Sequence, residues 1–262
     1  MKILVSAKRV TDPDARIRLK RDLSGIEVEG LEFKMNPFCE NAIEEALRLR
    51  DVHGGEIIAF TIGSGDATTE VRRALAMGAD RGIMVEGQDD QLDSDLVARL
   101  TAKIATDEGV DMVLLGKQAV DGDSNQVAQL CAEYLGWGHA TFASHPGGAA
   151  GMDGSTPGVE VAGGVAKVTR EVDGGSEVIE TDLPAVLSAD LRLNVPRLPT
   201  LPNIMKAKRK PLDVKTMAEL GVDAALKVKT VKYANPPERK AGIKVGSVEE
   251  LMDKLVNEAK AL

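Results

Sequence analysis

The segment Gly116–Gln126 carries the glycines and polar side chains best suited to binding a ligand. It reads Gly-Lys-Gln-Ala-Val-Asp-Gly-Asp-Ser-Asn-Gln and follows a short apolar run. Flexible glycines let backbone N–H groups wrap a phosphate, and the lysine and amides can contact a phosphate, a ribose or a base. The alternative is a polar loop in which Asp123 or Ser124 only caps the next helix. Asp121 and Asp123 lack a third nearby ligand, so no metal site is predicted.

Side chains that catalyse bond-making reactions are sparse. The histidines His53, His139 and His145 lack the i, i+4 spacing that places two metal ligands on one helix face. Cys39 and Cys131 do not have the spacing of a redox pair, and the chain contains neither a Gly-x-Ser-x-Gly elbow nor a Walker motif. We therefore predict a protein that is not an enzyme.

The first 140 residues alternate short apolar runs with amphipathic stretches, the pattern of parallel strands covered by helices. The predicted strands are Ile3–Ala7, Glu56–Ile62, Gly82–Val85 and Met112–Leu115. Helices are predicted to begin at Asn36-Pro37, near Asp66, near Ser94 and after Ser124. Asn36 is predicted to cap the first helix, and Gly78 to end the second in a left-handed conformation. This pattern predicts a doubly wound, mostly parallel α/β fold.

Ligands of an open parallel sheet bind beyond the carboxyl ends of its strands, where loops lead into helix N-termini. The loops in that position are Ser6–Val10, Ile62–Asp66 and Gly116–Gln126. The sequence therefore predicts that any phosphate is bound at this edge.

Beyond residue 136 the alternation of short apolar runs and amphipathic stretches ends. Pro146–Gly158 is rich in Gly, Pro and Ser and is predicted to be a flexible loop. Val159–Val172 and Ser176–Leu183 are predicted to form a β-hairpin joined by Asp173-Gly174-Gly175. Pro184–Ala189 is placed to return to the main sheet.

Asp190–Pro211 has neither helical nor strand periodicity and is predicted to be an extended surface excursion. Its apolar residues Leu198, Leu201, Ile204 and Met205 precede the basic run Lys206-Ala207-Lys208-Arg209-Lys210. Such a run is usually only a solvated face, but beside exposed apolar anchors it favours docking of an acidic partner. The tail ends in a predicted helix with Ser247 and Glu250 as a capping box.

The composition limits the partners and the compartment. A formal charge of −8 and 3% aromatic residues disfavour binding to nucleic acid or an anionic membrane. No apolar stretch approaches the roughly 18 residues of a membrane span, and Met1 leads directly into a predicted strand. Two cysteines favour a reducing compartment. We expect a cytoplasmic protein or the mature form of an organellar one, without direct membrane insertion.

Six segments carry a resemblance to a known family. They are Met35-Asn-Pro-Phe-Cys-Glu40, Ala74-Leu-Ala-Met-Gly-Ala-Asp-Arg-Gly82, Leu115-Gly-Lys-Gln-Ala119, Arg170-Glu-Val-Asp-Gly-Gly175, Ala189-Asp-Leu-Arg-Leu-Asn194 with Pro196-Arg197, and Leu201-Pro-Asn-Ile-Met-Lys-Ala207. In this order, and over nearly the whole chain, they resemble the beta subunit of electron transfer flavoproteins.

The resemblance implies an adenine nucleotide alpha hydrolase-like domain over 1–190, with a hairpin insertion at about 159–183. It also implies a partner-recognition loop over 191–211 and a C-terminal arm over 212–262 that packs on an alpha subunit. In such a heterodimer the alpha subunit holds most of a redox-active FAD, and the beta subunit binds a structural AMP. Electrons would pass from flavin dehydrogenases, including acyl-CoA dehydrogenases, to a membrane electron transfer flavoprotein-quinone oxidoreductase.

The resemblance also assigns residues by matching position. The AMP pocket would comprise Ser6, Asn36, Pro37, Phe38, Cys39, Ile62, Gly116, Lys117, Gln118, Ala119, Val120, Asp121, Gly122, Asp123, Ser124, Asn125, Gln126 and Val127. Phe38 would also lie near the FAD. Leu201 matches the leucine that anchors partner dehydrogenases, with electrostatic support from Lys206, Lys208, Arg209 and Lys210.

The chain departs from the family in places. Pro13 stands where the family often has a tyrosine, and the loop 146–158 is longer and richer in glycine. Asp121-Gly122-Asp123 is similar to electron-bifurcating members that bind a second FAD in place of AMP, whereas Asn125 and the segment Asn36–Cys39 favour AMP. A stand-alone ATP-binding module with the same sheet is a further alternative.

Overall fold

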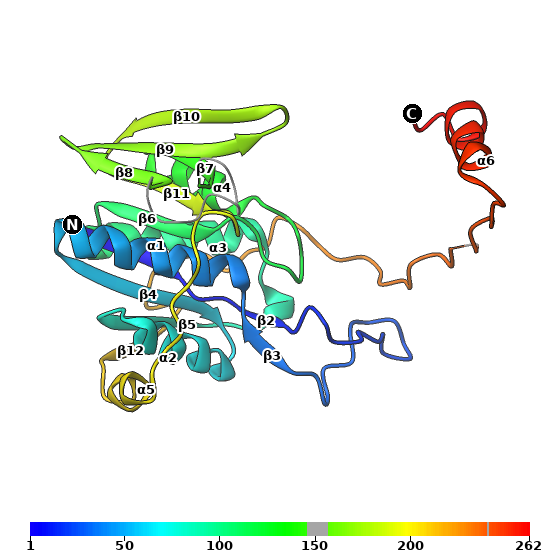
Figure 1. Cartoon of the computed structure of the whole chain (residues 1–262). Coiled ribbons are helices and arrows are strands. Elements are labelled where there is room, and N and C mark those ends of the chain that lie inside the picture. The colour runs from blue at the N-terminus through cyan, green and yellow to red at the C-terminus, as the bar shows by residue number, and fades with distance from the viewer. Residues whose placement is uncertain (146–156, 240) are drawn as a thin grey trace. The chain divides into compact units, whose positions relative to one another are not determined.

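The computed structural model describes residues 1–145, 157–239 and 241–262 (Figure 1). The predicted loop Pro146–Gly158 therefore lies almost wholly outside the described residues. The chain divides into two units, one of residues 1–16 and 28–230, the other of residues 17–27 and 231–262. The first unit contains the main sheet and every residue of the predicted nucleotide site.

The main sheet has the strand order β10-β9-β7-β11-β6-β1-β4-β5-β12, with β8 paired to β9. All neighbours from β7 to β12 are parallel, whereas β9 runs antiparallel to β7, β8 and β10. The central strands are β1 Lys2–Ser6, β4 Glu56–Gly63, β5 Arg81–Glu86, β6 Met112–Gly116 and β7 Gly138–Ala143. The prediction of a mostly parallel, doubly wound sheet is confirmed.

Two hydrophobic cores cover the two faces of this sheet. Helices α1 (Pro37–His53) and α2 (Thr68–Met77) pack on the face that carries Ile3 and Val5 of β1. Helices α3 (Ser94–Glu108) and α4 (Val127–Leu135) pack on the opposite face, with Leu4. Because successive strand residues point to opposite faces and both faces are covered, the interior of β1, Ile3 to Val5, is apolar at every position.

The predicted helices are present, and their ends have local causes. Asp93 caps α3 by accepting a hydrogen bond from the Leu96 N–H at 2.7 Å. Gly78 ends α2 with a φ of 142°, which is not the predicted left-handed helical conformation. A Cβ at Gly78 would lie 2.8 Å from Cδ2 of Leu47 in α1. Close packing of α2 on α1 therefore requires glycine here.

The predicted hairpin contains one strand more than expected. Val159–Val172 was expected to be a single strand, but Gly163 and Gly164, both with positive φ, divide it into two. The strands are β8 Val159–Ala162, β9 Val165–Val172 and β10 Gly175–Asp182. The predicted return to the sheet is confirmed, since β11 (Ala185–Ala189) lies parallel between β6 and β7.

The predicted extended excursion contains a helix, so that prediction is wrong in part. Residues 190–200 have no regular structure, but α5 spans Leu201–Ala207. The strand β12 (Leu212–Thr216) then joins the sheet beside β5, so residues 212–216 belong to the sheet and not to an arm. Sequence periodicity missed α5 because it has only two turns.

The second unit holds a short hairpin bridge between Leu19 and Ile26, and the terminal helices α6 (Val248–Asp253) and η4 (Lys254–Glu258). Ser247 caps α6 as predicted, by accepting from the Glu250 N–H at 3.2 Å. The Glu250 carboxylate accepts from the N–H of Gly246 at 2.8 Å.

A ribbon of β2 (Arg9–Thr11) and β3 (Phe33–Met35) was not predicted, because each strand has only three residues. The remaining elements are the short 3-10 helices η1 (Gly65–Ala67) and η2 (Asp89–Gln91). Over the part of the chain that the structure describes, no helix combines the length and apolarity needed to cross a bilayer.

Candidate functional site

The carboxyl ends of β6, β1 and β4 lie side by side, because these strands are adjacent and parallel. The loops that leave them are the predicted segments Gly116–Gln126, Ser6–Val10 and Ile62–Asp66. The start of α1 joins this edge, as the hydrogen bonds described next show. Pro37, the first residue of this 17-residue helix, has no N–H, and the N–H groups of Cys39 and Glu40 donate to the carbonyl oxygen of Asn36. The helix therefore contributes to this edge mainly the positive end of its dipole.

Asn36 joins the start of α1 to the loop after β6. Its Nδ2 donates to the carbonyl oxygen of Gln118 at 2.8 Å, and its Oδ1 accepts from the N–H of Val120 at 3.3 Å. The side chain makes no capping hydrogen bond to α1, so the prediction that it caps the helix is wrong. Asn36 is buried, and bonding to the loop satisfies both ends of its amide.

Ser6, Cys39 and Gly116 meet at the same point. The Ser6 hydroxyl accepts from the Gly116 N–H at 3.3 Å and lies 3.2 Å from Sγ of Cys39. A Cβ at Gly116 would lie 2.9 Å from the main-chain carbon of Phe38. The first turn of α1 and the loop after β6 are therefore in close contact. Phe38, predicted to lie near a flavin, is buried in this contact with 7% of its surface exposed.

The loop after β6 contains two residues in a strained, left-handed backbone conformation. Asp123 and Asn125 adopt positive φ values of 52° and 49°. Left-handed conformations cost roughly 1–2 kcal/mol per residue for L-amino acids, although Asn and Asp tolerate them best. Helix α4 begins at Val127 with Gln126 at its N-cap position, and neither Asp123 nor Ser124 caps it. The structure therefore does not support the alternative in which Asp123 or Ser124 serves only to cap the next helix.

The two lysines at this edge are paired with carboxylates. Lys8 Nζ lies 2.8 Å from Asp121, and Lys117 Nζ lies 3.0 Å from Asp190. Although burial opposes ionisation of Asp190, hydrogen bonds from Arg192 and Lys117 hold its pKa below the ordinary value. An anion bound here would therefore rely chiefly on backbone N–H groups. Sequence reasoning missed Asp190, although it directly follows a strand whose carboxyl end lies at this edge.

The other predicted residues of the site lie around this centre. Ile62 and Val127 pack against the core on the α3 and α4 face. Asp121, Gly122, Asp123, Ser124 and Gln126 are exposed, whereas Pro37, Lys117, Gln118, Ala119, Val120 and Asn125 are half-buried. The structure thus brings the predicted residues to one edge, with polar groups on its accessible side.

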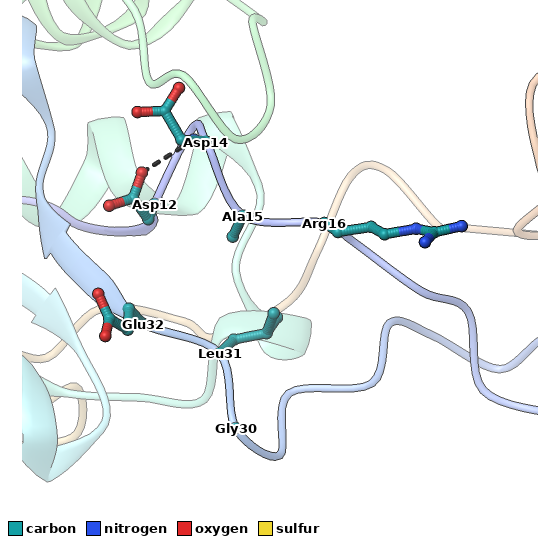
Figure 2. A pocket seen from close by; sticks show the side chains of 7 residues that line it. All are labelled: Asp12, Asp14, Ala15, Arg16, Gly30, Leu31 and Glu32. Atoms are coloured by element: carbon teal, nitrogen blue, oxygen red, sulfur yellow. Dashed lines mark hydrogen bonds between the residues drawn. The ribbon is translucent and has the colours of Figure 1, made fainter.

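A hollow of about 390 Å³ lies beside the β2–β3 ribbon (Figure 2). It is lined by Asp12, Asp14, Ala15, Arg16, Gly30, Leu31 and Glu32. Asp12 accepts from the N–H of Asp14 at 2.8 Å and pairs with Lys34 at 3.0 Å; these contacts lower its pKa. None of the predicted nucleotide residues lines this hollow, and it adjoins Pro13.

The three histidines and two cysteines differ in their exposure to solvent. Cys131 is buried, and burial raises the pKa of its thiol to about 12. His53 and His139 are exposed, and His145 is buried. Among the described residues, no group of three His, Cys, Asp or Glu side chains is placed to hold a metal ion.

The predicted docking residues Leu201 and Lys206 lie in α5, and Lys208, Arg209 and Lys210 follow it directly. Leu201 is 73% exposed, and Met205 and Ile204 are also exposed. Lys206, Lys208 and Arg209 are exposed as well. Lys210 differs, because its ammonium group donates to the backbone carbonyls of Leu75 and Ala79.

Comparisons with a family model and with individual known proteins all match this chain to the same family. The family model described as "Electron transfer flavoprotein domain" matches residues 25–220. The chain is 46% identical over 265 residues to a protein of Bradyrhizobium diazoefficiens named "Electron transfer flavoprotein subunit beta", and the match covers all of both chains. It is 46% identical to the human protein of the same name, over 97% of this chain and 96% of that one. It is also 46% identical to "Electron transfer flavoprotein subunit beta, mitochondrial" of Arabidopsis thaliana, over 99% of each chain.

Proposed function

This chain belongs to the electron transfer flavoprotein family, where it aligns with beta subunits from end to end, and from that premise we propose a specific role. It acts in a heterodimer with an alpha subunit that holds most of an FAD. The dimer takes electrons from flavin dehydrogenases, such as acyl-CoA dehydrogenases, and passes them to a membrane quinone oxidoreductase. The beta subunit itself catalyses no bond-making reaction.

One observation carries the nucleotide-binding part of this proposal: Asn36 ties the start of α1 to the loop after β6. The tie holds a helix N-terminus against a polar loop with two left-handed residues, Asp123 and Asn125. Backbone N–H groups of the loop and the positive end of the α1 dipole suit a phosphate, and the amides of Gln118 and Asn125 suit a ribose or base. We assign the full predicted set of residues at this edge to a structural AMP.

The chemistry of electron uptake and release belongs to the FAD, which would lie at the boundary between the subunits. This chain contributes packing around the flavin, with Phe38 proposed to lie near it, and docking of partner enzymes. We place the carrier in the bacterial cytoplasm, or in the mitochondrial matrix for a mature eukaryotic form. No nucleic acid or direct membrane insertion is part of this role.

Analysis of the nucleotides released from the purified heterodimer by acid tests the proposal. We expect one FAD and one AMP per heterodimer. Two FADs without AMP would replace it with the electron-bifurcating alternative. A stable monomer that binds ATP and copurifies with no flavin subunit would instead indicate a stand-alone ATP-binding module.

Docking of dehydrogenases is assigned to α5. Leu201 and Met205 are exposed apolar side chains beside Lys206, Lys208 and Arg209, on a chain whose formal charge is −8. An apolar anchor ringed by positive charge suits an acidic surface with an apolar pocket.

Leu201→Ala should slow electron acceptance from an acyl-CoA dehydrogenase, because truncating an interface anchor typically costs about 1–2 kcal/mol or more of binding. Stopped-flow reduction of the FAD measures this rate, and released FAD and AMP should remain at wild-type amounts. Val52→Ala is the control, since Val52 is 76% exposed on α1 and lies outside the docking segment. Equal rates for wild type and Leu201→Ala, with intact cofactors, would exclude docking through α5.

A further inference from the structure

The C-terminal end of α5 is fastened to α2. Arg72 Nη1 donates to the carbonyl oxygens of Ala207 at 2.8 Å and Lys210 at 2.7 Å. In return, Lys210 Nζ donates to the carbonyl oxygens of Leu75 at 3.0 Å and Ala79 at 2.5 Å. Carbonyl groups at a helix C-terminus lack intrahelical partners and favour a cation. This end of α5 is therefore held by four hydrogen bonds that run in both directions.

The chain that leads into α5 is fastened to α1. Arg197 binds the carboxylate of Glu44 through both oxygens, with Nε at 2.8 Å and Nη2 at 2.9 Å. The backbone N–H of Arg197 donates to the same carboxylate at 3.0 Å. The Glu44 side chain is only 8% exposed, and bidentate pairs of this kind are strong and directional.

Asn194 adds a second attachment three residues earlier. Its Nδ2 donates to the carbonyl oxygen of Asn41 at 3.0 Å and to Glu45 at 3.0 Å. Asn41 Nδ2 donates back to the carbonyl oxygen of Asn194 at 2.7 Å. The approach to α5 is thus bound along little more than one turn of α1, from Asn41 to Glu45.

Between these attachments the chain is exposed and apolar. Leu198, Leu201 and Met205 are 82%, 73% and 56% exposed. A helix of seven residues without a side-chain cap is not stable by itself in water. Ala207, its last residue, is buried in the core. The attachments on either side therefore account for the helical conformation of α5.

We propose that Arg72 and the Glu44–Arg197 pair are positioning residues, which hold α5 preformed for docking and so set the affinity for dehydrogenases. A segment that is ordered before it binds avoids much of the conformational entropy cost of association. This inference rests on the proposed docking function of α5. It also limits the docking charges to Lys206, Lys208 and Arg209, because Lys210 is engaged with α2.

The experiment compares Arg72→Met, Leu201→Ala and the double variant in the intact heterodimer, with an acyl-CoA dehydrogenase as electron donor. We expect Arg72→Met to raise the KM for the heterodimer about fivefold or more, through the added ordering cost, with kcat and cofactor content unchanged. In the Leu201→Ala background, Arg72→Met should add little, because the anchor it positions is already gone. Lys2→Met is the matched control: Lys2 Nζ also donates to a backbone carbonyl, that of Glu108, but lies away from α5.

Each outcome distinguishes the inference from the proposed function. If Leu201→Ala raises KM and Arg72→Met does not, or if the two effects simply add, the positioning role is overturned while docking stands. If Leu201→Ala itself leaves KM unchanged, the docking function fails. Should Arg72→Met not assemble, Arg197→Lys gives the same comparison, because lysine keeps the charge but cannot bridge both oxygens of Glu44.

Discussion

Single residues determine how closely α1 approaches the predicted nucleotide loop. Asn36 bonds across 82 residues of sequence to Gln118, and Gly116 leaves room for the backbone of Phe38. Neither role follows from residue type alone, since an asparagine before a helix normally suggests a cap. At the scale of single residues we make two predictions, one on the packing of Gly116 and one on the charge of Glu45.

Gly116→Ala should displace the loop after β6 or the first turn of α1. The new Cβ would lie 2.9 Å from two carbon atoms of Phe38 and 3.0 Å from the Cys39 nitrogen. We expect a loss of about 1–3 kcal/mol of stability from overpacking, together with loss of AMP from the heterodimer. Thermal unfolding and nucleotide analysis measure the two effects.

Gly122→Ala is the control for that substitution. Its nearest neighbour would be Ser124 Oγ at 3.8 Å, and its φ is not positive. It should keep wild-type stability. Equal stability of the two variants would contradict the close-approach explanation.

Glu45 should make stability depend on pH. Burial raises the pKa of its carboxyl group, against a hydrogen bond from Asn194 that lowers it. An acid whose pKa is raised in the folded state contributes stability below its unfolded pKa, and this contribution is lost as pH rises through the folded value. Glu45→Gln should therefore lose less stability than the wild type as pH rises above the ordinary pKa of a glutamate.

Chemical denaturation at a series of pH values measures that difference. Glu133→Gln, an exposed glutamate on α4, is the control and should follow the wild-type profile. Parallel profiles for wild type and Glu45→Gln would show that burial of the Glu45 carboxylate has no cost.

At the scale of elements, a strap of residues 223–228 is bound to the start of α3. Asp93 uses Oδ1 to cap α3 and Oδ2 to accept from the N–H groups of Lys227 and Val228, at 2.7 and 2.9 Å. Arg99 donates to the carbonyl of Ala225 at 2.6 Å. These hydrogen bonds hold the strap, which is close to the end of the first unit, against α3.

Asp93→Ser should separate the two functions of this carboxylate. Serine is a good helix cap, so α3 should remain intact, but it leaves the strap amides without their acceptor. We expect faster hydrogen exchange at Lys227 and Val228, with a stability loss of about 1–2 kcal/mol. Asp93→Ala should in addition destabilise α3. Unchanged exchange at both amides in Asp93→Ser would show that other contacts hold the strap.

At the scale of the whole molecule, the nucleotide should stabilise the fold by mass action. A ligand that binds only the folded state adds about 1.4 kcal/mol per tenfold excess over its Kd. Heterodimer stripped of AMP should unfold at a lower temperature, and added AMP should restore the midpoint in a concentration-dependent way. Adenosine, which lacks the phosphate, should restore less. A midpoint insensitive to AMP would contradict a structural nucleotide at this edge.

Local sequence determined much of this protein. Apolar periodicity, Pro37 and the Ser247–Glu250 cap were enough to predict the parallel sheet, its four covering helices and the helix of the tail. These features act over a few residues, within which backbone propensity and burial decide the conformation. The order of strands, loops and helices also predicted that the candidate site residues lie together at one edge of the sheet, as they do.

Tertiary structure alone decided the remainder. The helix α5, the place of β12 in the sheet and the use of Asn36 as a tie depend on partners far away in sequence, such as Leu75, which lies 135 residues from Lys210. Two turns of helix and a five-residue edge strand have too little intrinsic preference to be predicted. Their conformations are stabilised by contacts that form only when the whole chain folds, and no local pattern encodes them.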